Sequence, residues 1–517
     1  EYVPASGDQT LGNATVELLT ADSLTVLNTL TTLANGLYSF TGYPAGDYIV
    51  RVTPPAGYAS TVDTANSNDT TEPDYNADNN DNGPGTANGS VTSGVLTMTP
   101  GGGTATGGGA KTVTIANGTT TDTTVDFGFN TLTFSLGNRV WFDTDNDGVI
   151  DAGENGVSGV RVELYKDTDA SGDYSVGDIS VGFKTTDASG YYRFDDLDAG
   201  EYVVMIPNDN FTSGGTTDAL LGYWSSGTSR ADNGTVSESA TNDPDTNSDT
   251  NIDENGETTF SGNVVNYVSS AAVTIGPATN EPTGESDLSS SGQGNLDNRA
   301  NMTVDFGFYQ VNIGDLVFVD ADVNGSYGAG DDELDGATVT LLAGNGTTSL
   351  GTFTTGADGK YAFTGLPEGN YIIRVTPPNG YVSTVDLGTT ANPDNNTNND
   401  DNGPTQDVPG PVTSGTLVMN AGEFGSNSIG HTTDNTVDFG FKSVYSLGNR
   451  VWFDTNNNRI QDNAESGVNG VLVQLYFDTN LSGQYEAGTD TLVTTDTTDA
   501  NGYYRFDNLE PGSYLVI

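Results

Sequence analysis

The chain has 517 residues, of which 70 are acidic and 15 are basic, so its formal net charge at pH 7 is −55. An acidic excess on this scale excludes nucleic acid and anionic membrane surfaces as partners, because binding to phosphate requires lysine and arginine. The absence of cysteine excludes disulfides and thiolate metal sites, and no apolar run is long enough to span a membrane.

Two kinds of repeat alternate along the chain. The stretch Ser-Leu-Gly-Asn-Arg-Val-Trp-Phe-Asp-Thr begins at Ser135 and again at Ser446, and Tyr-Ile-Val-Arg-Val-Thr-Pro-Pro at Tyr48 returns almost unchanged at Tyr371. The motif Val-Asp-Phe-Gly-Phe ends a repeat three times, beginning at Val125, Val304 and Val437. We therefore divide the chain into module A (residues 1–130), module B (131–309), module A′ (310–442) and module B′ (443–517).

Both ends of the sequence are predicted to lie inside a module. Module A has no counterpart of the opening strand of module A′, residues 311–320, and module B′ stops within a predicted strand at residues 514–517. We expect the sequence to be a window on a longer repetitive chain. The alternative is that a neighbouring chain donates the missing strand to module A.

Short alternating segments separated by Gly-containing turns predict β-strands throughout. In each module we expect an opening strand, a second strand, an aromatic strand after a Gly turn, a fourth strand, a long polar excursion with one hairpin, and a closing Val-Asp-Phe-Gly-Phe strand. The aromatic strands are expected at residues 35–40, 189–194, 358–363 and 501–506. With no helical periodicity, this pattern predicts an all-β rod of tandem antiparallel immunoglobulin-like β-sandwiches.

A twelve-residue acidic loop joins the first two predicted strands of module B. It matches the calcium loop of an EF-hand, with Gly148 at the sharp turn and oxygen ligands expected from Asp143, Asp145, Asp147, Asp151 and Glu154. Carboxylates crowded into one loop repel each other unless a hard cation lies among them, and Ca2+ suits six to eight oxygens better than Mg2+ or Zn2+. Because both flanks read as strands, we predict a Ca2+ loop between strands rather than between helices.

Four further loops repeat this pattern with changes. In module A′ the expected ligands are Asp320, Asp322, Asn324 and Asp331. In module B′ they are Asp454, Asn456, Asn458, Asp462 and Glu465, with Arg459 where glycine is expected, so this copy is predicted to bind more weakly. A second loop of module B offers Asp167, Asp169, Asp173 and Asp178, and its degraded copy in module B′ offers Asp478, Asn480, Gln484, Thr489 and Asp490.

The segments around these loops resemble a known family. Gly-Asn-Arg-Val-Trp-Phe-Asp-Thr-Asp-Asn-Asp-Gly from Gly137, followed by Thr-Asp-Ala-Ser-Gly-Tyr-Tyr-Arg-Phe from Thr186, is similar to the B-type repeat of serine–aspartate-repeat bacterial surface proteins. The resemblance is strong in modules B and B′ and looser in A and A′. It implies Cna-B-like, calcium-bound extracellular domains that form a stalk or fibre. Such domains often carry a Lys–Asn isopeptide bond, but the opening strands contain no lysine, so we predict none here.

Runs rich in Asp and Asn recur in three modules, at residues 72–83, 243–256 and 392–403. Their similar placement favours a cation-bound loop, whereas their composition is equally typical of a flexible solubilising loop. Both interpretations stay open.

The sequence contains no set of residues that is typical of a catalytic site. His431 is the one histidine, no nucleophile is paired with a base, and the carboxylates fall in cation loops, so we predict that this region is not an enzyme. Trp141 and Trp452 recur at one strand position and are expected in the core, whereas Trp224 has no repeat and is a candidate surface contact.

The sequence therefore predicts a structural cell-surface protein, a stalk or filament stiffened by Ca2+, whose partners are neighbouring modules or further copies of itself. The alternative is an adhesin whose sandwiches bind a glycan or a protein. A hydrolase with its catalytic domain outside this window stays open as well.

Overall fold

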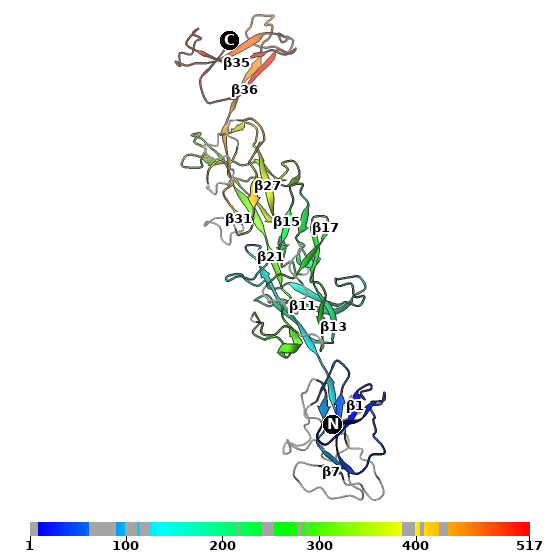
Figure 1. Cartoon of the computed structure of the whole chain (residues 1–517). Coiled ribbons are helices and arrows are strands. Elements are labelled where there is room, and N and C mark those ends of the chain that lie inside the picture. Colours follow the sequence, from blue (N-terminus) through cyan, green and yellow to red (C-terminus); the bar gives the residue numbers. More distant parts are fainter. Residues whose placement is uncertain are drawn as a thin grey trace.

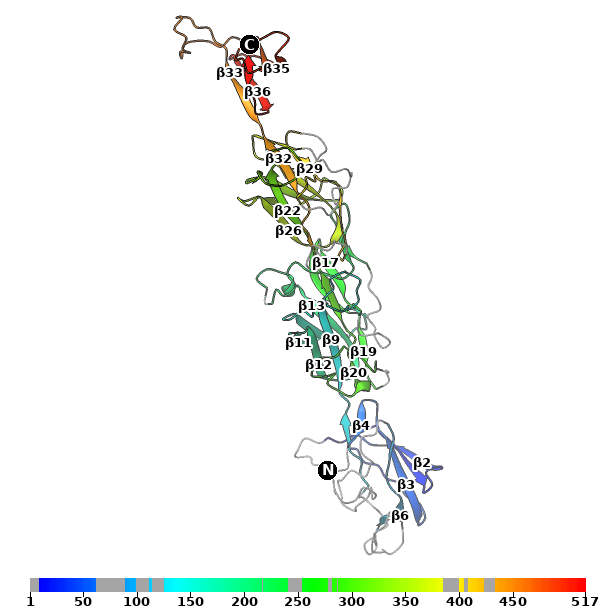
Figure 2. The ribbon, with the colours of Figure 1, turned by 90° about the vertical axis from the view of Figure 1, so that its left-hand side faces the viewer.

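In this computed structural model, the structure describes residues 9–61, 89–98, 111–113, 125–215, 217–239, 253–277, 281–285, 287–384, 399–403, 408–422 and 433–517. Apart from two short 3-10 turns, η2 (Asn208–Asn210) and η3 (Asp297–Arg299), every regular element described is a β-strand. The sheets follow one another along a line, with the two chain termini in the bodies at its opposite ends (Figures 1 and 2). The predicted all-β, tandem-sandwich fold is confirmed, while the module boundaries stay predictions.

Module B is a two-sheet sandwich. One sheet has the order β11-β10-β13-β18-β17 with β19 paired to β13, and the other has the order β12-β9-β21-β14 with β20 paired to β9. The bounds of these strands and of two others in the module are β9 (Phe134–Phe142), β10 (Arg161–Lys166), β11 (Ile179–Thr185), β12 (Tyr191–Leu197), β13 (Gly200–Pro207), β14 (Trp224–Ser225), β15 (Thr228–Arg230), β16 (Val236–Glu238), β17 (Glu257–Ser261), β18 (Val264–Ser269), β19 (Val273–Ile275), β20 (Ala300–Asn301) and β21 (Phe306–Tyr309).

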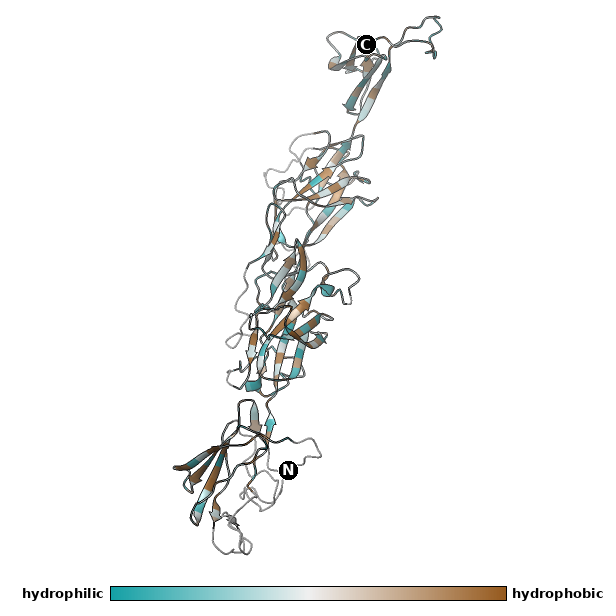
Figure 3. Ribbon diagram, turned by 90° about the vertical axis from the view of Figure 1, so that its right-hand side faces the viewer, coloured by the Kyte–Doolittle hydropathy of each residue, from teal (hydrophilic) through white to brown (hydrophobic). Residues whose placement is uncertain are grey.

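The core of module B lies between the two sheets and follows the alternation of the sequence. Val162 and Leu164 of β10 are fully buried and face an inner layer that includes Leu136, Phe306 and Phe308, while Arg161 and its alternate neighbours point outward. Figure 3 shows the same alternation as apolar and polar bands along the strands. Trp141 is fully buried, as expected.

Module A′ repeats this sandwich. The bounds of its strands are β22 (Val311–Val319), β23 (Asp332–Glu333), β24 (Thr338–Ala343), β25 (Ser349–Thr354), β26 (Lys360–Leu366), β27 (Glu368–Thr376), β28 (Tyr381–Ser383), β29 (Val412–Thr413), β30 (Leu417–Met419), β31 (Thr433–Asp434) and β32 (Phe439–Ser443). Its core is a separate cluster that includes Val339, Tyr371 and Phe439.

The closing strands differ from the predicted antiparallel arrangement. β21 pairs with β9 in parallel, and β32 pairs with β22 in parallel, so the sheets are mixed. A closing strand must leave the module in the direction that its opening strand points, because it leads straight into the next module. The polar excursion of module B also holds two hairpins, β15–β16 and β17–β18, instead of the one expected.

Module A shows one further difference. Its strands are β1 (Thr15–Thr20), β2 (Val26–Thr31), β3 (Gly46–Thr53), β4 (Tyr58–Ser60), β5 (Val91–Thr92), β6 (Leu96–Met98), β7 (Lys111–Val113) and β8 (Phe129–Thr131). The predicted aromatic strand at residues 35–40 is wrong, because these residues form a turn and an extended segment without ladder pairing. In the other modules the aromatic strand pairs with the opening strand, and module A has no such partner among its described residues. Tyr38 and Phe40 still pack against the core.

Module B′ has a small core of four buried residues in two separate sheets, β33-β36 and β35-β34-β37. The bounds are β33 (Tyr445–Arg450), β34 (Leu472–Phe477), β35 (Thr491–Thr497), β36 (Tyr503–Leu509) and β37 (Tyr514–Val516). Trp452, which was expected in the core, is only half-buried here.

One junction is built differently from what the sequence suggested. Residues 224–239 of module B, here called the arm, extend along module A′, and β15 joins the A′ sheet by parallel pairing with β27. The indole Nε1 of Trp224 donates a hydrogen bond to the carbonyl of Gly365 at 2.9 Å. Trp224 therefore contacts the neighbouring module and is not a lone surface residue. Among the described residues, no strand of module B′ enters a sheet of module A′.

Candidate metal centres

The backbone of the first acidic loop of module B is folded around its first carboxylate. Asp143 follows the end of β9, and its Oδ2 accepts a hydrogen bond from the amide of Gly148 at 3.0 Å. Gly148 has a φ of +77°, a left-handed conformation that glycine adopts without steric cost. The loop therefore closes on itself at the position where the pattern requires a sharp turn.

The last carboxylate of the same loop closes its other side. Glu154 accepts hydrogen bonds from the amide of Thr144 at 2.5 Å and from the amide of Asp151 at 3.0 Å. These two amides belong to distant parts of the loop, so the side chain of Glu154 links the two parts.

Two overlapping groups of carboxylates converge inside this frame. Asp143, Asp145 and Glu154 each place an oxygen within 4.8 Å of the others, and so do Asp145, Asp147 and Asp151. The structure thus brings together all five residues predicted from the sequence. Burial raises the pKa of Asp143 to about 6 and raises that of Glu154, because neither charge is well solvated. A hard cation would offset this cost and would meet only oxygen donors, so the set fits such an ion.

The second loop of module B repeats the frame with one difference from the prediction. Asp167, Asp169 and Asp178 converge within 4.8 Å, whereas Asp173 is not part of the group. Its backbone carbonyl accepts a hydrogen bond from the Ser171 hydroxyl at 2.8 Å. Asp173 stands at the seventh position, which in this pattern contributes a backbone carbonyl, and Ser171 stands at the fifth, where a side-chain oxygen is expected. The sequence pattern was sufficient to assign both roles, because it specifies which positions bind through a side chain and which bind through a backbone carbonyl.

An aromatic contact fixes this second loop to the sheet. Tyr174 packs edge-on against Tyr165 of β10, with ring centroids 4.8 Å apart, and against Tyr267 of β18, at 5.3 Å. The equivalent pair in module B′, Tyr476 and Tyr485, lies 4.7 Å apart. The loop is therefore held by apolar packing as well as by its hydrogen bonds.

The loop of module A′ keeps the frame with fewer charges. Asp320, Asp322 and Asp331 converge within 4.8 Å. Gly325 donates its amide to Asp320 Oδ2 at 2.9 Å, and Asn324 stands at the fifth position, with its side-chain Nδ2 donating to Asp322 at 2.8 Å. All four predicted residues therefore lie in one loop.

In the loop of module B′, hydrogen bonds between side chains replace some of the charge. Asn456 and Asn458 both donate their amides to Asp462, at 2.7 and 2.9 Å, and Glu465 accepts from the amide of Thr455 at 2.7 Å. Arg459 takes the turn position at a φ of +66°, which is strained for a residue with a side chain. No three carboxylates of this module, all of which is described, converge as in module B. The degraded second copy likewise keeps the turn, since Gly483 donates to Asp478 at 2.8 Å.

The Asp- and Asn-rich runs fall mainly outside the described residues, as does His431. The ends of two runs are described, and both contact an acidic loop. The amide of Glu254 donates to the Gly148 carbonyl at 2.9 Å, and the amide of Asp401 donates to the Gly325 carbonyl at 3.0 Å. No such role was predicted for these residues from the sequence, although both stand at the end of an Asp- and Asn-rich run, directly before an Asn-Gly pair.

The arm also contacts the first loop of module B. The Ser226 hydroxyl donates to Asp143 Oδ2 at 2.6 Å, and the Gly227 amide donates to the side-chain oxygen of Asn146 at 2.8 Å. From the other side, a Cβ added to Gly422 of module A′ would lie 2.6 Å from the Cβ of Asp145. The loop is thus enclosed between its own module and the next.

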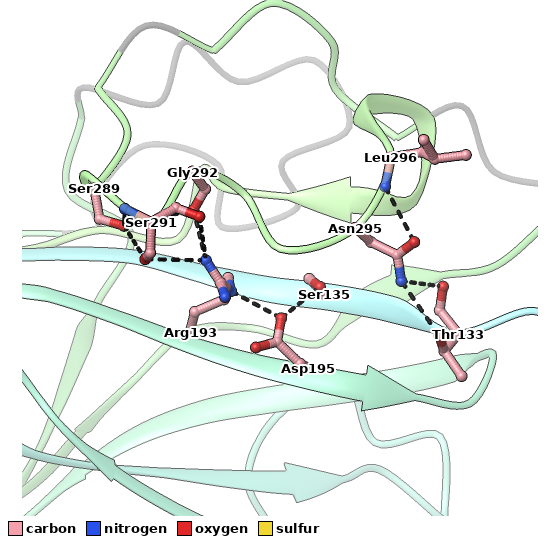
Figure 4. Close-up of polar contacts among 9 residues, drawn as sticks. All are labelled: Thr133, Ser135, Arg193, Asp195, Ser289, Ser291, Gly292, Asn295 and Leu296. Atoms are coloured by element: carbon pink, nitrogen blue, oxygen red, sulfur yellow. Dashed lines mark hydrogen bonds and ion pairs between the residues drawn. The ribbon is translucent and has the colours of Figure 1, made fainter.

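A hollow of about 280 Å³ in module B is a second candidate site, lined by residues that include Lys184, Tyr191, Arg193 and Ser289. Figure 4 shows that Arg193 is already occupied: its guanidinium donates to Asp195 at 2.8 Å and to the Gly292 carbonyl at 2.6 Å. Asn295, which lies on the same loop as Gly292, donates to the Thr133 carbonyl at 2.6 Å. These contacts bind the loop to β9 and β12, so they serve packing rather than recognition.

Comparison with known proteins gives a consistent result. The profile of the SdrD B-like domain matches residues 3–99, 134–259, 311–441 and 445–517. Serine-aspartate repeat-containing protein D of Staphylococcus aureus (strain MW2) is 31% identical over 507 residues, covering 95% of this chain and 27% of that protein. Serine-aspartate repeat-containing protein F of Staphylococcus epidermidis is 32% identical over 422 residues, covering 79% of this chain and 18% of that protein. The chain spans about a quarter or less of the length of these relatives.

Among solved structures, the shaft pilin SpaA of Lactobacillus rhamnosus GG matches at 11% identity with a TM-score of 0.23, covering 60% of this chain and 98% of that one. The predicted resemblance to serine–aspartate-repeat surface proteins is confirmed, and with it the expected cell-surface location. The matched family is one of surface-protein repeats and not of enzymes. In the described part of the chain, no helix has the length and apolar composition needed to span a membrane.

Proposed function

Since the chain belongs to the SdrD B-like domain family, we propose that it is a structural segment of a cell-surface stalk or filament, stiffened by Ca2+ bound in its acidic loops. The observation that carries this proposal is the position of the loops. In modules B and A′ the first ligand is hydrogen-bonded to the strand that leads into the next module: the amide of Asp143 donates to Phe308, and the amide of Asp320 donates to Phe441.

The mechanism that we propose is electrostatic and mechanical. Without a cation, converging carboxylates such as Asp143, Asp145 and Glu154 repel each other, and the loop opens. A bound Ca2+ would neutralise this repulsion and fix the first residue of the loop. Because that residue is bonded to the closing strand, the ion would also limit bending of the strand at the joint.

The joints themselves leave little slack. β21 ends at Tyr309 and β22 begins at Val311, and β32 ends at Ser443 and β33 begins at Tyr445. At the second of these joints, the ammonium of Lys442 pairs with Glu510 at 2.8 Å. With single-residue connections, fixing the closing strand narrows the range of orientations that the next module can take, and further contacts across a joint narrow it more.

The test measures distances between modules with and without the ion. Because the chain has no cysteine, pairs of spin labels can be introduced at exposed edge-strand positions, one pair to a joint: Asn28 with Ser180, Ser180 with Thr352, and Thr352 with Thr494. We expect narrow distance distributions in Ca2+ that broaden in excess chelator and narrow again when Ca2+, but not Mg2+, is restored. Distributions that stay narrow in chelator would refute the proposal.

A control separates stiffening from folding. Two further pairs of labels lie within single modules at exposed strand positions, Ser180 with Ser261 in module B and Thr352 with Val418 in module A′. They report whether each sandwich stays folded in chelator. Unchanged distances within modules together with broadened distances between them would assign the effect to the joints. Loss of both would mean that Ca2+ supports the folding of the modules, and the stiffening proposal would fail in its present form.

A further inference from the structure

Two glutamates lie behind the first loop of module B, outside every ligand set predicted from the sequence. Glu254 is 3% exposed, and its Oε2 has no hydrogen-bond partner, whereas Oε1 accepts from the Gly256 amide at 2.8 Å. Glu238, the last residue of β16, accepts from the Thr258 amide through one oxygen and has a buried, unpartnered Oε1. Two buried carboxylate oxygens therefore lack a hydrogen-bond donor among the residues that the structure describes.

The two side chains meet at one hydroxyl. Ser225 of β14 is fully buried, and its Oγ donates to Glu254 Oε1 at 3.4 Å, while its proximity to Glu238 lowers the pKa of that carboxyl in opposition to burial. Burial is the main reason why the pKa values of both carboxyls are raised, and the negative charge of Glu238 adds to the rise for Glu254. The three side chains thus surround a common point.

The surroundings of this point are apolar. A Cβ added to Gly256 would lie 2.6 Å from Glu254 Oε1, 2.6 Å from Val268 Cγ1 and 2.8 Å from Phe306 Cδ1, so the carboxyl borders the sandwich core. Two like charges in such a place cost several kcal/mol unless something of opposite charge joins them. Among the described residues, neither glutamate forms an ion pair with a lysine or an arginine.

We propose that Glu238, Glu254 and Ser225 bind a hard divalent cation, additional to those of the acidic loops. All donors are oxygens: two carboxylates, each able to bind through both oxygens, and one hydroxyl. That set selects Ca2+ or a similar hard ion over softer metals. The buried, unpartnered Oε2 of Glu254 is the observation that distinguishes this cluster from an ordinary acidic surface.

An ion at this site would hold the two ends of the arm together. Ser225 stands at the beginning of the arm and Glu238 at its end, whereas Glu254 belongs to the body of module B and is bonded to the first loop through Gly148. An ion among them would tie both ends of the arm to module B, and β15 between these ends is a strand of the A′ sheet. This mechanical role rests on the proposed function, whereas binding of the ion does not.

The test counts ions in the full chain. Bound calcium is measured by mass spectrometry of the dialysed protein at pH 7.5 in the wild type, in E238Q/E254Q, and in a control with the same loss of charge at exposed positions, D196N/D198N. We expect the glutamate pair to lose about one Ca2+ per chain and the control to lose none. An unchanged count in E238Q/E254Q would overturn the proposal and indicate that the two carboxyls share a proton instead.

A second measurement does not depend on the variant folding. Crystals of the wild-type chain grown with Ca2+ are measured at long wavelength, and an anomalous peak between Glu238 and Glu254 is the expected result. Absence of that peak, with peaks present in the acidic loops, would overturn the proposal. Spin-label distances that do not respond to chelator would instead refute the proposed stiffening and leave the ion count unaffected.

Discussion

The arm leads to a specific prediction, because one of its side chains, that of Trp224, contacts both module B and module A′. Trp224 is partly buried, packs against the cores of both modules and donates its Nε1 to Gly365. We expect W224A to open the B–A′ joint while both sandwiches stay folded. The reason is that the lost contacts belong to the interface, and neither core contains Trp224 among its fully buried residues.

The size of the effect follows from the contact. Half-burial of an indole removes roughly 100 Å² of apolar surface from water, worth about 2.5 kcal/mol. The hydrogen bond adds about 1 kcal/mol, and relaxation of the joint lowers the total, so a loss of about 2–4 kcal/mol is expected. At about 1.4 kcal/mol for each factor of ten, the joint should open roughly 30 to 1,000 times more often.

Opening of the joint can be measured as the hydrogen-exchange rate of two backbone amides of module A′, because both donate hydrogen bonds to module B. The amide of Asn345 donates to the Asp232 carbonyl at 3.0 Å, and the amide of Glu368 donates to the Tyr309 hydroxyl at 2.9 Å. Both should exchange faster in W224A, while amides in the centre of β24, such as Leu341, should not. W452A is the matched control, because Trp452 is also half-buried and lies in module B′. Unchanged exchange at Asn345 and Glu368 in a folded W224A chain would refute this account of the joint.

Three further predictions concern the loops. R459G should raise the Ca2+ affinity of the B′ loop several-fold in calorimetry, because it removes a positive charge and a left-handed φ of +66° that costs a non-glycine residue about 1 kcal/mol or more; equal affinities would contradict it. G422A should disturb the first loop of module B, since the added Cβ would lie 2.6 Å from that of Asp145. G410A is the control, because Gly410 has a φ of +94° and open space around it, so its effect should stay local. Spin-label distances across the B–A′ joint distinguish the two outcomes. Burial raises the pKa of Asp143 to about 6, of Glu238 to about 7 and of Asp438 to about 8, so the folded, calcium-free chain binds protons more readily than the unfolded chain. Its stability in chelator should therefore fall as the pH rises from about 4 to 8, and a melting temperature that rises over this range would contradict the prediction.

The repeating strands and loops could be predicted because their signals are local. The alternation of Val162 and Leu164 with outward polar residues fixes which face is buried, and the spacing from Asp143 to Glu154 fixes the loop. Both depend on residues that are neighbours in the sequence. The same spacing rule would also have placed Ser171 correctly, had each position of the second loop been compared with the pattern.

The arm could not be predicted from the same signals. β15 and β16 are each three residues long. β15 ends at Arg230, and its partner β27 begins 138 positions later, at Glu368. No alternation marks such a short strand, and its pairing depends on where module A′ lies. The parallel closing strands were missed for a similar reason, since strand direction is set by the connection and not by composition. Trp224 alone, lacking a repeat, marked a position with a special role.

The unequal joints bear on what the mechanical unit of the chain is. If each module were independent, every joint would rest on the single residue between a closing strand and the next opening strand, and the rod would bend at all joints alike. Between modules B and A′, however, a strand, an indole and an enclosed acidic loop all cross the joint. The described contacts at the joint between A′ and B′ are the β-strand connection, the Val444–Gly380 backbone hydrogen bond and the Lys442–Glu510 pair. Because Glu510 of that ion pair is exposed to water, the pair contributes at most about 1 kcal/mol, so bending should concentrate there, and the stiff element is the B–A′ pair instead of the single sandwich.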